Sequence, residues 1–284
     1  MKPLARITDP TAHLLPGTIT GPGAPLVMAH GLPVARALDT AACGKPGDPP
    51  GSIQTGSADV LIHGLPASAL GDSVVCGATV SMGAPQVFVG GASVTIPLNI
   101  QGSDDFIKQT QAAVATLYST PTGKQLFADI AASGHQVTIQ ETTDPNGYCK
   151  PHFDPLGNAA KPGKGVGSTV SWNPSHPAPG LAGNPNAAAV VLGHELVHAH
   201  HNATGTHGNG PDDSYPGQNG SSSRGEERKT VGCKGGTITQ PNGVPTAVPD
   251  HSKDIPTENS FRRDLGLPPR NSYYPNNWPG GPPW

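Results

Sequence analysis

Two histidines and a glutamate in the second half of the chain have the types and spacing of a metal-dependent hydrolytic site. His194 and His198 are four residues apart and enclose Glu195, in the pattern HExxH. Residues i and i+4 of a helix lie one turn apart on the same face, so one divalent ion can contact both imidazole rings. Glu195 is offset toward the water that such an ion holds and can act as its general base. The pattern predicts metal-assisted hydrolysis with His194 and His198 as ligands.

The residues around this pattern favour an interior helix. Asn184-Pro185-Asn186 offers a capping residue and an N-terminal proline before the apolar run Ala187–Leu192, and Gly205 can close the helix in a left-handed conformation. The alternative is that three matching positions arise by chance on a solvated helix surface. The apolar flanks favour the metal interpretation, because a solvated face would carry charged residues.

A site of this type needs a third protein ligand. A histidine six residues after His198 is excluded, because Thr204 stands there. His200 and His201 follow closely, but a helix turns them away from the face of His198, so we expect them to be solvated. The pair Glu226-Glu227, beyond a loop rich in Gly and Ser, is the remaining source. Spacing alone does not decide which of the two carboxylates binds.

Composition excludes several classes of function. A chain of 284 residues has room for two domains, and its net charge of −3 gives no reason to expect nucleic acid or an anionic membrane as partner. No apolar segment follows the first residues, and no run approaches the roughly 20 apolar residues that cross a bilayer. Classical secretion and membrane insertion are therefore not expected. Four cysteines are too few for a disulfide scaffold, and the pair Cys149 and Cys233 is left open between a disulfide and two thiols.

The first hundred residues contain an internal duplication with a period of 33. His30–Asp39 recurs as His63–Asp72, and Cys43 recurs as Cys76 at the same offset. Short β-like runs accompany the copies, at residues 26–29, 59–62 and 86–89, and related starts lie at residues 17–19, 51–53 and 77–80. Strand-sized pieces at regular spacing, without helical periodicity, predict a compact all-β unit wound with pseudo-threefold symmetry.

Beyond Pro97 the pattern changes to helices and a small sheet. Ser103-Asp104-Asp105 is a capping signal for a helix that ends near Tyr118, and residues 123–133 predict a second helix stopped by Gly134. Alternating residues at 135–140 and 168–172 predict strands before the HExxH helix. This order of elements is typical of an α+β domain.

Residues 1 to about 98 resemble a PAAR-repeat domain, the tip of the spike of bacterial type VI secretion systems. The resemblance is carried by Asp9–His13, by the two Gly-Leu-Pro-x-x-x-x-x-Asp segments and by Cys76-Gly77-Ala78. The chain departs from the name-giving tetrapeptide, with Pro33-Val34-Ala35-Arg36 and Pro66-Ala67-Ser68-Ala69 in its place. The resemblance implies docking on a valine-glycine-repeat (VgrG-type) spike trimer.

Members of the PAAR family hold a zinc ion near the point, and such an ion contributes folding free energy to a small fold. The positions that match its histidine and cysteine ligands are His13, Cys43 and Cys76. The loop at residues 44–55, where relatives often supply another histidine, has none. His30 and His63 are each candidates for the fourth ligand or for an ordinary polar turn residue.

Residues from about 105 to 275 resemble bacterial effector zinc metallopeptidases related to clostridial neurotoxin light chains. Four motifs carry the resemblance, in this order: His194–Ala199, Glu226–Gly232, Glu258–Arg262 and Arg270–Tyr273. The resemblance implies that Glu227 is the third metal ligand and that Arg270 and Tyr273 stabilise the oxyanion of the reaction. Packing beside Tyr274 is the alternative for Tyr273. Glu258 and Arg262, one helical turn apart, are interpreted as a structural ion pair.

These observations predict two domains, a small all-β PAAR-like cone at residues 1–98 and an α+β zincin-like metallopeptidase at residues 99–284. The predicted protein is a type VI secretion effector with one catalytic and one structural Zn²⁺. It would be made in the producer cytoplasm and delivered into the periplasm or cytoplasm of a target cell, where its endopeptidase cleaves proteins. A cognate immunity protein is an expected partner. The alternatives are a non-enzymatic spike-tip adaptor for a separate effector, and a zinc hydrolase of cell-wall peptides.

Overall fold

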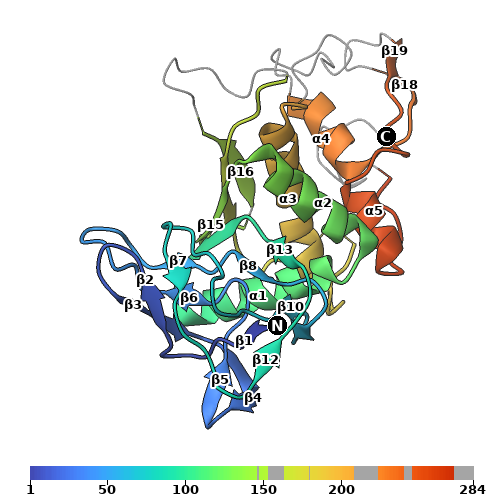
Figure 1. Cartoon of the computed structure of the whole chain (residues 1–284). Coiled ribbons are helices and arrows are strands. Elements are labelled where there is room, and N and C mark those ends of the chain that lie inside the picture. Colours follow the sequence, from blue (N-terminus) through green and yellow to red (C-terminus); the bar gives the residue numbers. More distant parts are fainter. Residues whose placement is uncertain (146, 153–162, 179, 208–222, 240–244, 272–284) are drawn as a thin grey trace.

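An all-β unit at the N-terminus is followed by an α+β unit, as the sequence predicts (Figure 1). The computed structural model describes residues 1–145, 147–152, 163–178, 180–207, 223–239 and 245–271. The predicted loop at 208–223 lies outside these ranges except for its last residue, and so do Tyr273 and the segment that follows it. No helix in the described ranges is both long and apolar enough to span a bilayer.

The N-terminal unit is made of short strands joined by tight turns. A five-stranded sheet has the order β11-β2-β3-β6-β7, and β4–β5 and β9–β10 form two antiparallel hairpins. The strands are β1 (Lys2–Pro3), β2 (Pro10–Ala12), β3 (Gly17–Gly21), β4 (Ala24–Ala29), β5 (Leu32–Val34), β6 (Thr40–Ala41), β7 (Gly51–Ser52), β8 (Thr55–Ser57), β9 (Leu61–Ile62), β10 (Leu65–Pro66), β11 (Thr79–Val80), β12 (Phe88–Val89) and β13 (Ser93–Thr95).

A turn that ends in a buried aspartate occurs three times and explains the predicted pseudo-threefold symmetry. In each copy the aspartate carboxylate accepts a hydrogen bond from the backbone N–H three residues earlier; the pairs are Arg6–Asp9, Arg36–Asp39 and Ala69–Asp72, at 2.8, 2.7 and 2.7 Å. The residue before each aspartate has a positive φ of 72° to 87°. Isolated bridges join each copy to the next, at Leu4–Ala69, Arg6–Val34 and Arg36–Ala67. The unit is therefore a closed ring of three related turns.

The first copy of this turn was not found from the sequence, which showed only the duplication at residues 30–39 and 63–72. Pro3-Leu4-Ala5-Arg6 precedes Asp9 as Pro33-Val34-Ala35-Arg36 precedes Asp39, but the two are 30 and not 33 residues apart. The third copy has Ala69 in place of the arginine. Burial therefore raises the pKa of Asp72, which has no guanidinium beside it.

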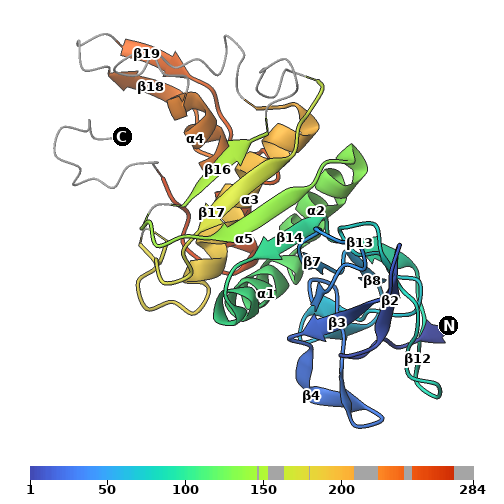
Figure 2. The ribbon, with the colours of Figure 1, turned by 90° about the vertical axis from the view of Figure 1, so that its left-hand side faces the viewer.

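The C-terminal unit is a four-stranded sheet with helices on one side (Figures 1 and 2). The sheet order is β14-β15-β17-β16; β14, β15 and β17 are parallel, and β16 is an antiparallel edge strand. The elements are β14 (Leu98–Gln101), α1 (Asp104–Tyr118), α2 (Pro121–Ser133), β15 (Val137–Glu141), β16 (Tyr148–Pro151), β17 (Ser168–Trp172), α3 (Ala187–Thr204), α4 (Ser223–Val231), β18 (Gly236–Thr239), β19 (Pro245–Val248) and α5 (Glu258–Asp264).

Local capping chemistry sets the ends of α1 and α2 close to where the sequence predicted them, whereas Asn186 at the start of α3 makes no side-chain capping hydrogen bond. The Ser103 side chain accepts from the backbone N–H of Phe106 at the start of α1, and Thr120 does the same for Gly123 at the start of α2. Gly134 and Gly205 close α2 and α3 in the left-handed conformation that glycine adopts without strain. The predicted helices are therefore confirmed to within a few residues.

Helix α3 is buried on nearly every side, which allows it to carry the HExxH residues inside the molecule. Gly193 lies where α1 and α5 meet it: a Cβ at this position would be 3.1 Å from the Leu117 side chain and 3.2 Å from the Phe261 ring. Those distances are tighter than ordinary van der Waals contact. The glycine before His194 thus lets two neighbouring helices approach the segment that carries the motif.

The two units share one hydrophobic core. Leu38 and Leu65 of the N-terminal unit are fully buried in the same cluster as Val114 and Leu117 of α1. Gln111 of α1 is 3% exposed and enters the second aspartate turn. Its amide donates to the Leu38 carbonyl at 2.9 Å and to Asp39 Oδ1 at 3.1 Å, and its carbonyl accepts from Arg36 Nη2 at 3.0 Å. The second aspartate turn and α1 therefore satisfy each other's buried hydrogen-bonding groups.

Replacing Gln111 by leucine should destabilise the whole chain, because Leu38 O and Arg36 Nη2 would each lose a buried partner. Each buried polar group left unsatisfied costs about 1–3 kcal/mol. We expect the free energy of unfolding, measured by urea denaturation, to fall by at least that amount. Gln125→Leu is the control, since Gln125 is exposed on α2 and bonds only to Asp129 there. Equal stability of the two variants would contradict the role of Gln111.

Candidate active site

His194 and His198 lie side by side on the buried face of α3. Each residue is 8% exposed, and the two ring centroids are 4.9 Å apart. Their Nε2 atoms approach the same carboxylate oxygen, Glu227 Oε2, at 3.1 and 3.2 Å. The three ligating atoms all lie within 4.8 Å of one another. The structure thus brings together the two histidines of the motif and the glutamate of α4 that was expected to be the third ligand.

The second nitrogen of each ring is held by another carboxylate. His194 Nδ1 lies 2.9 Å from Glu258 Oε2 of α5, and His198 Nδ1 lies 3.3 Å from Glu226 Oε1 of α4. An ionised carboxylate only accepts hydrogen bonds, so Nδ1 carries the proton in both rings. By the same rule each Nε2 donates to Glu227 Oε2, so both rings carry a second proton and a positive charge. A metal ion at this point would take the place of the Nε2 protons while each Nδ1 stays bonded to its carboxylate, which is the arrangement that metal-binding histidines need.

The charges around these rings favour a cation. Burial alone would lower the pKa of His194, but the hydrogen bonds that its ring donates to Glu227 and Glu258 outweigh burial and raise the pKa to about 9. Burial likewise opposes ionisation of Glu226 and Glu227, yet neighbouring imidazoles hold the pKa of both carboxyls well below the usual value: those of His198 and His201 for Glu226, and those of His194 and His198 for Glu227. Ionised carboxylates therefore surround the histidine pair at neutral pH, and positive charge is stabilised there.

The donor set fits a catalytic zinc ion. Two imidazole nitrogens and one carboxylate oxygen converge, and this combination is one that catalytic zinc uses while keeping a position for water. Each imidazole is also oriented by a carboxylate on its other nitrogen, as metal-ligating histidines are in known sites. His194, His198 and Glu227 are therefore the residues that would hold the ion.

Glu195 has the surroundings of a proton acceptor. It is 7% exposed, and in the described part of the chain its carboxylate makes no hydrogen bond. Burial raises the pKa of Glu195, and the neighbouring imidazoles partly offset this effect. The backbone of Gly147, which precedes β16, lies against it: a Cβ there would be 3.3 Å from Glu195 Oε1. The carboxylate is thus held between the catalytic helix and the edge of the sheet, with its proton-accepting capacity unused.

Glu258 is the centre of a buried charge network behind His194. Its Oε1 accepts from Arg262 Nε at 2.8 Å, which confirms the ion pair predicted from the spacing of these residues. Its Oε2 accepts from Arg270 Nη1 at 3.0 Å as well as from His194. These partners outweigh burial and lower the pKa of Glu258 to about 2. Arg270, expected as an oxyanion donor, here supports the carboxylate that orients His194.

The expectation that His200 and His201 are solvated is wrong. They are 8% and 5% exposed, because α2 and α4 cover the side of α3 that was taken as its outer face. His200 Nε2 lies 3.1 Å from Asp129 Oδ2 of α2, and His201 Nδ1 lies 2.6 Å from Glu226 Oε1 of α4. An extended apolar run around α3, visible in its sequence, was the signal that this helix has no single solvent face.

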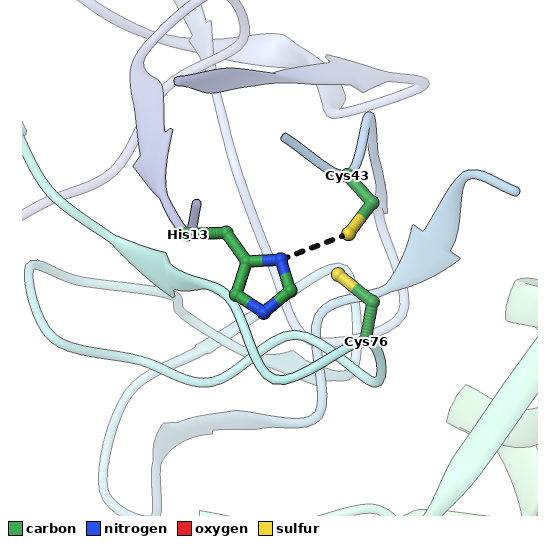
Figure 3. Close-up of side chains that lie close together, drawn as sticks. All are labelled: His13, Cys43 and Cys76. Atoms are coloured by element: carbon green, nitrogen blue, oxygen red, sulfur yellow. Dashed lines mark hydrogen bonds between the residues drawn. The ribbon is translucent and has the colours of Figure 1, made fainter. Parts of the chain in front are cut away.

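A second group of metal-ligating side chains lies in the N-terminal unit. His13, Cys43 and Cys76 point toward one another (Figure 3), and their ligating atoms lie within 4.8 Å of each other. His13 Nδ1 is 3.4 Å from Cys43 Sγ. Asp48 Oδ2, which the sequence analysis did not consider, is 3.6 Å from the same sulfur. One imidazole and two thiols are three of the four ligands that a structural zinc site of the Cys₂His₂ or Cys₃His type uses.

His30 and His63 do not belong to that group. Both lie at the turns of the two β-hairpins, with positive φ values of 50° and 48°. Each is followed by a glycine that also has a positive φ. Of the two interpretations left open by the sequence, the hairpin geometry favours the polar turn residue.

Cys149 and Cys233 are free thiols. Cys149 lies on β16, and its Sγ accepts from Asn202 Nδ2 of α3 at 3.6 Å. Burial raises the pKa of Cys149 to about 12, so it remains protonated at neutral pH. Cys233 is buried beyond the end of α4, and burial raises its pKa as well. Both side chains therefore act as small apolar packing groups.

Two family models match the chain, each over one of the units. The model Peptidase_M91, described as "Effector protein", matches residues 95–273, which is more than half of the chain. The model described as "PAAR motif" matches residues 9–82 and 44–96. Comparison with curated proteins found no match.

Among solved structures, the chain is similar to the crystal structure of Clostridium botulinum neurotoxin serotype F light chain. The identity is 14% and the TM-score is 0.29. The match covers 52% of this chain and 44% of that light chain, so the chain spans less than half the length of this relative.

Proposed function

This chain belongs to the Peptidase_M91 family of effector proteins, and on that premise we propose that it is a zinc endopeptidase delivered by a type VI secretion system. The observation that carries the proposal is the convergence of His194 Nε2, His198 Nε2 and Glu227 Oε2 beside the buried carboxylate of Glu195, which accepts no hydrogen bond from the residues that the structure describes. The PAAR motif supports delivery on a spike. The substrates are proteins of the target cell, in its periplasm or cytoplasm.

Peptide hydrolysis follows from the chemistry of the residues present. Zinc held by His194, His198 and Glu227 would lower the pKa of its water and polarise a peptide carbonyl. Glu195 accepts the proton of the attacking water and transfers it to the leaving amine. Glu226 and Glu258 keep the two imidazoles in the tautomer that binds metal through Nε2. The burial of these groups strengthens each interaction, because little water screens them.

Two further residues are proposed to act on the substrate, and this part of the proposal rests on resemblance alone. Arg270 and Tyr273 match the positions of oxyanion donors in the related metallopeptidases, and a donor aimed at the developing charge is a large contribution to catalysis. Arg270 donates to Glu258 beside the site, and the same carboxylate accepts from the candidate ligand His194. Tyr273 lies two residues beyond the described range that ends at Asn271.

We propose that the N-terminal unit holds a second, structural zinc through His13, Cys43 and Cys76. The cluster is partly exposed and lies at the end of strands that have little core of their own. A metal ion bound there would add folding free energy that the small apolar cluster does not supply.

An exposed apolar residue repeats in the three strands that carry the threefold relation, and it supports docking on a trimeric spike. Met28 of β4, Leu61 of β9 and Phe88 of β12 each pair with a proline of the neighbouring strand, and they are 53%, 43% and 54% exposed. Apolar side chains at equivalent positions of a pseudo-threefold unit match a partner with threefold symmetry. We call these three residues the apolar ring and propose a VgrG-type trimer as its partner.

The two units are proposed as domains of residues 1–98 and 99–284. The first is the spike-docking tip and the second is the peptidase, as the ranges of the two family models suggest. A producing cell would need a cognate immunity protein that blocks the peptidase. The alternatives remain a non-enzymatic tip that binds a separate effector, and a hydrolase of cell-wall peptides.

Glu195→Gln should abolish proteolysis while metal binding is kept, because the amide cannot accept the proton. Loss of a positioned general base costs about 10²–10⁴-fold in rate. We expect new protein N-termini in target-cell lysate treated with the full chain, and none with the variant, by N-terminal proteomics. Stem peptides of the cell wall are incubated with the chain in parallel, as the substrate that the alternative function would require. Undiminished cleavage by Glu195→Gln would remove Glu195 from the mechanism.

The enzyme hypothesis predicts two zinc ions per chain, and the adaptor hypothesis predicts one. His194→Ala combined with His198→Ala should remove one ion, and Cys43→Ser combined with Cys76→Ser should remove the other. Mass spectrometry of the dialysed full chain measures the metal content. A single zinc that survives the histidine changes and is lost with the cysteine changes would support the adaptor.

Aspartate in the apolar ring should weaken binding to a VgrG-type trimer, since a charge would be buried at the contact. Met28→Asp combined with Phe88→Asp is expected to reduce affinity at least about tenfold, which corresponds to about 1.4 kcal/mol. Leu14→Asp is the matched control, because Leu14 is 73% exposed and adjoins His13 instead of the ring. Titration calorimetry against the trimer measures the affinity of both variants. Equal loss in both variants would argue against docking through the ring.

A further inference from the structure

We propose that His201 is a positioning residue for the candidate metal centre, acting through Glu226 on the ligand His198. The inference rests on the proposed function in one respect, namely that His198 binds the metal. His201 contacts neither the convergence point of the ligands nor Glu195 in any interaction that the described residues show. It is instead the group that fixes the carboxylate behind His198.

Among the described contacts of Glu226, the shortest is with His201. Glu226 Oε1 lies 2.6 Å from His201 Nδ1, 3.3 Å from His198 Nδ1 and 3.3 Å from Thr230 Oγ1. Thr230 Oγ1 is also 3.1 Å from His198 Nδ1. A carboxylate oxygen accepts, so both imidazoles donate from Nδ1 to the same atom. Of the described partners of the oxygen that orients His198, His201 therefore makes the shortest hydrogen bond to it.

Burial makes this anchoring consequential. Glu226 is 3% exposed, His201 is 5% exposed and Thr230 is fully buried. Water does not readily replace a lost donor at such a depth, and a buried carboxylate that loses one hydrogen bond shifts toward its remaining partners. Removal of His201 would thus let Glu226 move relative to His198, and the direction of His198 Nε2 would be less well fixed.

The same contact joins the two helices that supply the ligands. His198 and His201 are three residues apart, so α3 directs both rings at α4. Glu226 receives them, and its neighbour Glu227 provides the third ligand from the same turn of α4. His201 therefore holds α4 against α3 at the point where Glu227 must meet the two histidines. Its removal affects two ligands at once.

His200 provides a matched comparison on the same helix. It is as buried as His201 and also contacts a carboxylate, Asp129 Oδ2 of α2, at 3.1 Å. That contact is with α2 and not with α4, although the His200 ring also lies edge-on to the His201 ring, with centroids 5.7 Å apart. Loss of His200 removes a buried histidine–carboxylate pair of the same kind without touching Glu226 or Glu227. A purely structural role for His201 would make the two histidines equivalent.

The test measures zinc affinity of the full chain by competition with a chelator, for His201→Leu, His201→Asn and His200→Leu. Changes in groups that orient a metal ligand typically reduce metal affinity about 10–100-fold. We expect that loss for His201→Leu and no more than a few-fold change for His200→Leu. His201→Asn should restore most of the affinity, because its amide nitrogen stands where Nδ1 stood and can donate to Glu226. Equal affinities for His201→Leu and His200→Leu would overturn the proposal.

Cobalt absorption assigns the change to the correct centre. Cobalt bound by the thiols of Cys43 and Cys76 gives sulfur charge-transfer bands, which a centre of imidazole and carboxylate lacks. His201→Leu should alter the visible ligand-field bands and leave the sulfur bands unchanged. An altered sulfur band with unaltered ligand-field bands would refute the assignment.

A second comparison applies if His201→Leu does not fold. His201→Gln carries the same amide as His201→Asn but one bond further out, so it cannot place the donor on Glu226 Oε1 equally well. Weaker zinc binding by His201→Gln than by His201→Asn supports positioning, and equal binding contradicts it. Failure of the proposed function would give a different result. In a chain that keeps His201, replacing His194 and His198 would then remove no zinc.

Discussion

The structure of the C-terminal unit depends on a carboxylate opposite the Nδ1 atom of each imidazole in the candidate metal centre. Glu258 of α5 serves His194, and Glu226 of α4 serves His198. A buried charge without a partner costs several kcal/mol, so these helices cannot be exchanged for elements that offer only apolar packing. With each Nδ1 occupied, both Nε2 atoms face Glu227. The orientation of the ligands is thus a consequence of charge compensation in the interior.

That compensation requires segments far apart in the sequence to meet closely on α3, and small residues make room for them. Gly193 lets the Phe261 ring of α5 pack directly on the turn that carries the motif, which brings Glu258 within reach of His194. Gly147 similarly lets the start of β16 approach Glu195. Either position would force its neighbour to move if it carried a Cβ. The close packing around α3 therefore also sets the positions of the catalytic groups.

The parts of the fold and site that could be predicted from the sequence are those set by neighbours along the chain. Caps such as Ser103 and the spacing of HExxH depend on local geometry, so helix ends and the histidine pair followed directly. The contact between His201 and Glu226 could not be predicted in this way. Projection of the sequence onto a helix assumes one buried side, whereas several helices cover α3. Asp48 was missed because only histidine was sought in its loop. Glu227 was preferred over Glu226 by resemblance, and the geometry that separates their roles exists only in three dimensions.

The proposed boundary between residues 98 and 99 marks a change of element type and not a break in the core. Leu98 begins β14 of the peptidase sheet, yet it is fully buried in the same cluster as Leu65 of the tip. Gln111 closes the second aspartate turn, and Ser52 of β7 exchanges hydrogen bonds with the first residues of β14. A tip joined to its cargo by a flexible tether could release it or let it rotate. An N-terminal unit that shares buried polar contacts with the peptidase unit holds the catalytic helix in a fixed orientation relative to the apolar ring, so the proposed docking on a spike would also orient the peptidase.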